Sequence, residues 1–114
     1  MQTTSTVFMV KPARFGFNPQ TAQSNAFQRK DGFGKAVQEA ALREFLAYAT
    51  LLRANGVNIA LAEDSLEPRT PDSIFPNNWF TTHEDGTLVL YPMAAPNRRE
   101  ERKAHFLDII KKNF

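Results

Sequence analysis

An apolar stripe of helical period, set between two apolar runs, constrains what this chain can fold into. We predict a helix over residues 34–55, because Gly56 stands where a helix stop belongs and because apolar residues recur there at steps of four, four, three and four. The stripe consists of Val37, Ala41, Phe45, Tyr48 and Leu52. The flanking runs at 6–10 and 57–62 are typical of buried strands. The order strand, helix, strand predicts a parallel pair with a right-handed crossover.

Composition limits the class of protein and the chemistry. The chain has 114 residues, 42% hydrophobic and 23% charged, which fits one soluble globular domain. No run is long enough to span a bilayer and residues 1–5 lack signal-peptide order, so we expect a cytoplasmic protein without a membrane partner. Cysteine is absent, which excludes disulfides, thiolate metal sites and a cysteine nucleophile. His83 and His105 form no close-spaced metal pair, and we expect no cofactor.

The net charge gives little indication of binding partners. Fourteen basic and 12 acidic residues give a net charge of +2. The densest basic cluster lies within residues 98–103 and is interrupted by Glu100 and Glu101. We interpret this cluster as a solvated helix face rather than a nucleic-acid footprint, so no nucleic-acid partner is expected.

Polar side chains stand out in the run from residue 71 to residue 80. Its apolar content predicts a strand over 73–82, followed by a hairpin turn at 84–86 and a partner strand at 87–91. The run nevertheless carries one carboxylate, two amides and two prolines, which a core strand does not favour. A ligand-presenting role explains Asp72, Asn77 and Asn78. The alternative is a capped turn at 71–73 with a loop tip at the two asparagines.

Two further segments frame this run. Residues 12–33 show no period and form a long loop with four phenylalanines and several amides, which favours either a lid over a small polar ligand or a loop pinned by its aromatic side chains. A last helix is predicted from Asn97, with Glu100 as its reciprocal capping partner, to residue 114. A helix this apolar should lead to another strand, and the chain stops there.

These motifs resemble the opening of dimethylarginine dimethylaminohydrolase. That family carries Pro-Asp-x-x-Phe-x-Glu-Asp and, after a hairpin, Ala-Pro-Ser-Arg-Arg-x-Glu. This chain has Pro-Asp-Ser-Ile-Phe at 71–75, the asparagine pair at 77–78 and Ala-Pro-Asn-Arg-Arg-Glu at 95–100. The segment 9–28 is similar to the amidinotransferase-like branch known as citrulline-utilisation hydrolases. It has Met-Val-Lys-Pro, then Phe15, Asn18, Thr21 and Asn25-x-Phe27-Gln28. Both groups belong to the guanidino-group-modifying, or pentein, superfamily, and the resemblance covers about residues 7–114.

The resemblance implies a fold and a reaction. The fold is an α+β propeller of five ββαβ units, of which residues 1–114 would form the first and part of the second, a truncated N-terminal fragment of one pentein domain. In the reaction, a cysteine thiolate attacks the central carbon of a guanidinium or ureido group while a histidine moves protons. The matching cysteine and histidine belong to later repeats. We therefore expect the N-terminal portion of an amidinotransferase-like hydrolase, inactive alone and without a catalytic residue of its own.

What this portion would supply is a hold on an amino-acid substrate. By match to the motif, Asp72 would accept hydrogen bonds from substrate N–H groups and Arg98 would clamp the α-carboxylate. Phe75, Asn77 and Asn78 complete the implied substrate-binding set, and the loop from Phe15 to Phe27 would correspond to the lid. Two amides replace the family's Glu-Asp, so a buried guanidinium would lose countercharge. We therefore predict that a citrulline-like ureido substrate is preferred over a methylated arginine.

Two other interpretations remain open, and truncation adds an expectation about assembly. The chain would otherwise be a binding module that recognises an amino acid without catalysis, or an α/β domain whose resemblance reflects descent alone. Interrupting a propeller here would leave strand edges and the apolar face of residues 106–114 uncovered. We therefore expect either that copies of the chain associate through exposed strand edges as a homo-oligomer or that the chain is poorly soluble.

Overall fold

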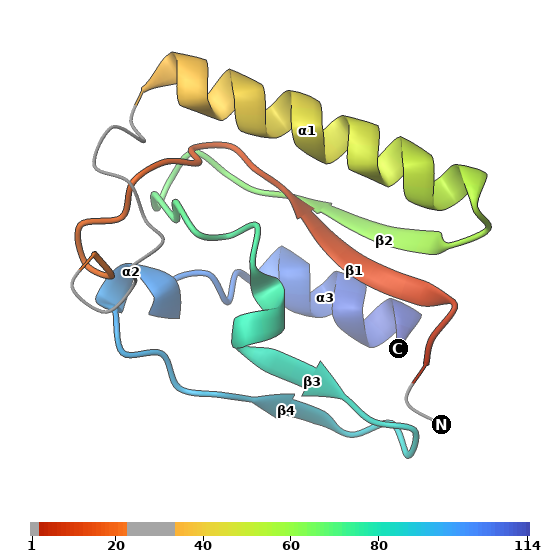
Figure 1. Cartoon of the computed structure of the whole chain (residues 1–114). Coiled ribbons are helices and arrows are strands. Elements are labelled where there is room, and N and C mark those ends of the chain that lie inside the picture. Colours follow the sequence, from red (N-terminus) through yellow and green to blue (C-terminus); the bar gives the residue numbers. More distant parts are fainter. Residues whose placement is uncertain (1–2, 23–33) are drawn as a thin grey trace.

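Two parallel strands joined by one helix form the first part of the fold, as predicted. The structure is a computed structural model that describes residues 3–22 and 34–114. Strand β1 (Thr6–Lys11) pairs in parallel with β2 (Asn58–Glu63) over six residue pairs. Helix α1 (Lys35–Ala54) connects them and lies along one face of the pair (Figure 1). The parallel pair and the helix between its strands are therefore confirmed.

Helix α1 ends and packs largely as its sequence pattern predicts. Gly56 follows the helix with a φ of 82°, a conformation that glycine adopts without strain. Ala41 and Phe45 of the predicted stripe are buried. Tyr48 is not, because it is 56% exposed, and Ala49 is the buried residue at that level of the helix. The face turned to the strands is therefore slightly rotated from the predicted one.

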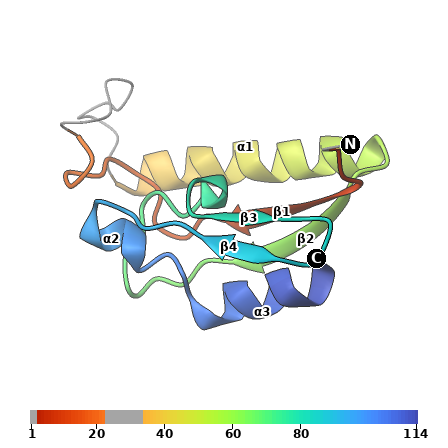
Figure 2. The same cartoon turned by 90° about the horizontal axis from the view of Figure 1, so that it is seen from below.

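The core joins residues from distant parts of the chain. Val10 of β1 and Ala62 of β2 pack with Trp79, and with Phe106 and Ile110 of α3 (Ala104–Asn113). Helix α3 lies on the face of the strands opposite α1 (Figure 2). Because the fully buried indole of Trp79 belongs to the polar run at 71–80, the core itself anchors that run.

The predicted strand over 73–82 is wrong except at its end. Residues 71–74 form a turn, and η1 (Pro76–Asn78), a single 3₁₀ turn, follows. Only β3 (Phe80–Thr82) is extended, and it pairs antiparallel with β4 (Leu88–Leu90), so the hairpin is confirmed. A proline at the first position of η1 explains the break, since proline cannot donate to a ladder but suits the start of a helical turn. The turn that the alternative interpretation places at 71–73 is therefore present, as part of the turn at 71–74.

The predicted helix over 97–114 is also wrong, because it is split in two. A single turn, α2 (Pro96–Arg99), precedes α3, and residues 100–103 between them are not helical. Asn97 is not a cap; Ala95 occupies that position, and its side chain makes no capping hydrogen bond. The break allows side chains at 101 and 103 to turn inward to buried partners. The described chain is a mixed α and β fold, and the five-unit propeller stays a prediction.

A buried ion pair ties the segment after β2 to the start of α3. Lys103 Nζ lies 2.5 Å from Asp64 Oδ1, and the two side chains are 8% and 0% exposed. Asp64 also accepts hydrogen bonds from Thr70 Oγ1 at 3.1 Å and from Ser73 Oγ at 2.8 Å. The turn that carries residue 72 is thus held by one carboxylate.

Neither α1 nor α3, nor any other helix in the described ranges, has the length and apolar content that crossing a bilayer requires.

We expect Asp64→Ala to reduce the free energy of unfolding by about 3–5 kcal/mol, because it leaves Lys103 buried without a countercharge. Glu63→Ala, which removes the exposed partner of Lys11, is the matched control and should cost less than about 1 kcal/mol. Urea denaturation followed by the fluorescence of Trp79, the single tryptophan, measures both. If Asp64→Ala does not fold, Asp64→Asn provides the comparison. Equal losses of unfolding free energy in Glu63→Ala and Asp64→Ala would contradict the structural role of the Asp64–Lys103 pair.

Candidate functional site

A pocket of about 520 Å³ lies where the 71–78 turn faces the segment around α2. Four of the five predicted site residues line it: Asp72, Phe75, Asn78 and Arg98. Gln20 of the loop after β1 closes one side, and Met93 adds an apolar side chain. Residues separated by almost eighty positions in the sequence therefore meet around one cavity.

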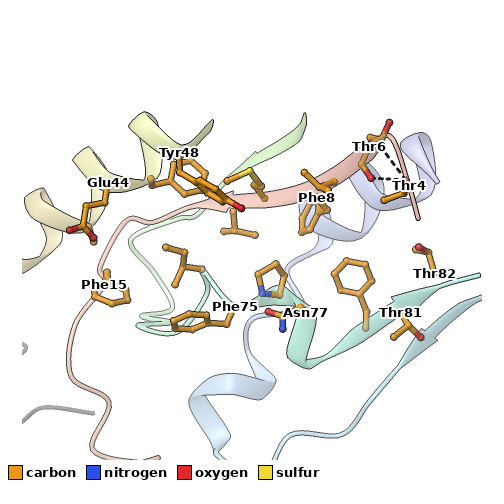
Figure 3. A pocket seen from close by; sticks show the side chains of 18 of the residues that line it. Thr4, Thr6, Phe8, Phe15, Glu44, Tyr48, Phe75, Asn77, Thr81 and Thr82 are labelled. Carbon is orange, nitrogen blue, oxygen red and sulfur yellow. Dashed lines mark hydrogen bonds between the residues drawn. The ribbon is translucent and has the colours of Figure 1, made fainter. Parts of the chain in front are cut away.

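The fifth predicted residue, Asn77, lies in a different place. It lines a larger groove of about 1270 Å³ between α1 and β1 on one side and η1 and β3 on the other (Figure 3). Glu44 is the only charged residue that lines this groove in the described part of the chain, and most of its other lining side chains are apolar. Phe75 borders both cavities. The two asparagines at 77 and 78 therefore do not act on one ligand in this arrangement.

Asp72 is half-buried, and its carboxylate accepts one hydrogen bond from an uncharged side chain. Its Oδ2 accepts from Asn18 Nδ2 at 2.8 Å. Within the described ranges, no cationic side chain forms an ion pair with Asp72, and its Oδ1 accepts no side-chain hydrogen bond. Among the described residues, one oxygen of this carboxylate is therefore left for a ligand.

Arg98 is the organising residue of the pocket wall. Its Nε and Nη2 donate to Glu101 Oε2 and Oε1 at 2.8 and 3.0 Å, a bidentate pair. Nη2 also donates to the Phe75 carbonyl at 3.1 Å, and Nη1 to Asn78 Oδ1 at 2.9 Å. Of its five N–H hydrogens, one on Nη1 has no strong acceptor among the described residues. Arg98 thus joins α2 to η1 and keeps a single N–H for the pocket.

The solvated-face interpretation of residues 98–103 is wrong for three of its members. The Arg98 side chain is 11% exposed, Glu101 is fully buried, and Lys103 is 8% exposed. Burial raises the pKa of Glu101, and the hydrogen bonds and charge of Arg98 act in the opposite direction. The negative charges of Asp72 and Asp64 raise it further. Of the two acidic residues that interrupt the basic cluster, Glu101 is therefore a buried partner of Arg98.

Sequence reasoning missed several residues that build the pocket. Glu101 stands three positions after Arg98, the spacing of a helical ion pair, and that signal was available. Asn18 was part of the resemblance at 9–28 but was assigned no role, and Gln20, in the same aperiodic loop, gave no signal. Of the predicted lid, Phe15 lines the larger groove and Gln20 the pocket, whereas Phe27 and the rest of 23–33 lie outside the described residues.

The pocket offers groups that can bind a small polar ligand. It offers a carboxylate that accepts, an asparagine and an arginine N–H that donate, and the apolar surface of Phe75. The chain has no cysteine to act as a nucleophile. In the ranges that the structure describes, no group of three or more His, Asp or Glu side chains could hold a metal ion. A small polar molecule with both N–H donors and an acceptor fits these groups.

Comparison with known proteins identifies a family for nearly the whole chain. Residues 11–114 match the family described as N,N dimethylarginine dimethylhydrolase, eukaryotic. No curated protein and no solved structure matches the chain. The matched range includes every residue that lines the pocket.

The raised pKa of Glu101 leads to a pH-dependent stability. Because the folded state binds the proton more tightly than the unfolded state, the contribution of Glu101 is fully present below about pH 4.5 and is lost as the pH rises through the folded-state pKa. The difference in unfolding free energy between wild type and Glu101→Gln should therefore fall as the pH is raised above about 4.5. Urea denaturation at a series of pH values measures it. The control is Glu100→Gln, which changes an exposed residue. If the unfolding free energy relative to wild type changes with pH equally in both variants, the pH dependence does not come from Glu101.

Proposed function

Because the chain belongs to the N,N-dimethylarginine dimethylhydrolase family, we propose that it is the substrate-holding N-terminal portion of a hydrolase acting on a guanidino or ureido amino acid. The observation that supports this function is the convergence of Asp72, Phe75, Asn78 and Arg98 on one pocket. The chain contributes the hold on the substrate, and the cysteine and histidine that carry out the reaction lie outside it.

The orientation of Asn78 supports a ureido substrate such as citrulline. Arginine only donates hydrogen bonds, so the atom of Asn78 that faces Arg98 Nη1 is its oxygen. The amide nitrogen, with no acceptor among the described residues, is then left to donate into the pocket. A donor suits the carbonyl oxygen of a ureido group, whereas a guanidinium presents only N–H groups. Asp72 would accept from the N–H groups of the same ureido group.

The shortage of negative charge in the pocket also favours a ureido substrate over a guanidinium. A guanidinium taken out of water needs negative partners. Among the described residues that line the pocket, Asp72 is the only acidic one, and the nearby Glu101 is already paired with Arg98. A neutral ureido group carries no such cost. Arg98 would meet the α-carboxylate of the amino acid through its one remaining Nη1 hydrogen, a single contact instead of the bidentate clamp that its motif implies.

The absence of cysteine favours a second candidate function. The chain would then be an amino-acid-binding module that uses the same pocket without catalysis. Sequence continuing past Phe114 with a cysteine and a histidine would support the hydrolase, whereas binding by a chain that has no such continuation would support the module.

We expect isothermal calorimetry to give tighter binding of citrulline than of dimethylarginine. Asn78→Ala should weaken citrulline binding about threefold to tenfold and reduce the preference, because it removes one neutral hydrogen bond. Asn77→Ala removes the neighbouring amide, which faces the groove, and should leave both affinities unchanged. Tighter binding of dimethylarginine, or equal effects at 77 and 78, would rule out this substrate preference.

We also propose that copies of the chain associate through the free edge of β1. Among the described residues β1 pairs only with β2, and its other edge borders the apolar groove. Of the described residues that line the groove, only Glu44 is charged, so a second copy meets little like-charge repulsion there. Light scattering should show mass that rises with concentration, and Met9→Lys should lower it. A monodisperse monomer at all concentrations would contradict the proposal.

A further inference from the structure

A buried asparagine connects the loop after β1 to both walls of the pocket. Asn18 is fully buried although it lies in a loop. Its Nδ2 donates to Asp72 Oδ2 at 2.8 Å and to Asn97 Oδ1 at 3.0 Å. Its Oδ1 accepts from Asn97 Nδ2 at 2.8 Å and from the Gln20 backbone N–H at 3.0 Å. Each amide of the Asn18–Asn97 pair thus donates to the other and accepts from it.

We propose that this reciprocal amide pair orients the Asp72 carboxylate toward the ligand, which makes Asn18 a positioning residue of the site. The inference rests on the proposed function, because it names a role in holding the same substrate. The added residue, Asn18, contacts Asp72 and α2 and affects the ligand only through them.

The hydrogen-bond chemistry leaves one orientation for the pair. A carboxylate oxygen only accepts, so the Asn18 atom that faces Asp72 is the amide nitrogen. Its oxygen must then face Asn97 Nδ2 and the Gln20 N–H, both of which are donors. All four contacts are consistent with this orientation. They use both N–H hydrogens and the oxygen of the buried Asn18 amide, which holds that side chain in a single arrangement.

The same loop also fixes the wall that carries Arg98. Gln20 Oε1 accepts from the Asn97 backbone N–H at 2.8 Å, one of the N–H groups left without an intrahelical partner at the start of α2. Arg98 is the next residue of that turn. The loop therefore contacts the Asp72 side and the Arg98 side at once, and the separation across the pocket depends on it.

A neutral partner suits Asp72 better than a cation would. A lysine or arginine at this position would also fix the carboxylate, but it would neutralise the charge that a ligand N–H array needs. The Asn18 amide supplies a hydrogen bond and leaves the net charge in place. This distinguishes the Asn18–Asp72 contact from the charged pairs Asp64–Lys103 and Arg98–Glu101, which hold the fold around it.

The test is a double-mutant cycle on citrulline affinity, measured by calorimetry with Asn18→Ala, Asp72→Ala and the double variant. We expect Asn18→Ala to weaken binding about tenfold and to cause no further loss when Asp72 is already alanine, because the effect passes through that carboxylate. Asn97→Ala should weaken binding in the same direction. Asn113→Ala, whose amide bonds only within α3, is the control and should have no effect.

A second readout does not depend on a ligand. In the ¹⁵N spectrum of the free chain, the side-chain NH₂ of Asn18 should exchange slowly with water and should shift when Asp72→Ala removes its acceptor. It should not shift in Asn113→Ala. If Asn18→Ala does not fold, Asn18→Ser takes its place in the cycle.

The outcomes separate the two levels of inference. Wild-type binding with additive losses at 18 and 72 overturns the positioning role and leaves the proposed function standing, as does an Asn18 resonance indifferent to Asp72→Ala. If the wild-type chain binds neither citrulline nor arginine, the proposed function fails and the positioning role falls with it. A shifted resonance together with non-additive losses supports both.

Discussion

The buried pair of Asp64 and Lys103 is the interaction on which the rest of the structure depends. It joins the end of the parallel strand pair to the start of α3, whose apolar side chains complete the core around Trp79. The hydroxyls of Thr70 and Ser73 use the same carboxylate, so the turn between them has little freedom. Buried ion pairs add little net stability compared with apolar packing but are costly to break. Their effect here is to give the 70–73 turn one position.

The pocket is built on that turn. Its polar side chains use most of their hydrogen-bonding groups within the protein and leave the rest for a ligand. Asp72 gives one oxygen to Asn18, Asn78 gives its oxygen to Arg98, and Arg98 gives four of its five N–H groups to the protein. Each keeps one group for a ligand. Polar groups held in this way lose little freedom on binding, so more of each contact energy contributes to affinity. This division also sets the chemistry, since what remains is one charged acceptor and two donors.

Periodicity predicted the parts of the fold whose side chains obey it. The strands and helix of residues 6–63 and the hairpin after residue 80 follow from alternation, from the helical stripe and from turn residues. Prediction failed at 73–82 and 97–114, where apolar content suggested regular elements. There, Lys103 turns inward to Asp64, 39 positions away in the sequence, and no local pattern reveals such a partner.

The candidate site was predictable to the extent that it resides in a motif. The Pro-Asp-x-x-Phe and Arg-Arg motifs identified Asp72, Phe75 and Arg98. Spacing alone could not separate Asn77 from Asn78, because a 3₁₀ turn directs adjacent residues to different cavities. Asn18 could not be assigned a role, since its importance depends on contacts with residues 54 and 79 positions away.

The central claim is that Asp72, Asn78 and Arg98 act together on one ligand in the smaller cavity. Chemical-shift mapping of ¹⁵N-labelled chain during a citrulline titration tests it most directly. The account predicts that the backbone amides of these three residues move together with a single dissociation constant, while Tyr48 and Thr82 of the groove do not move. Shifts confined to the groove, or unrelated shifts at 72 and 98, would contradict it.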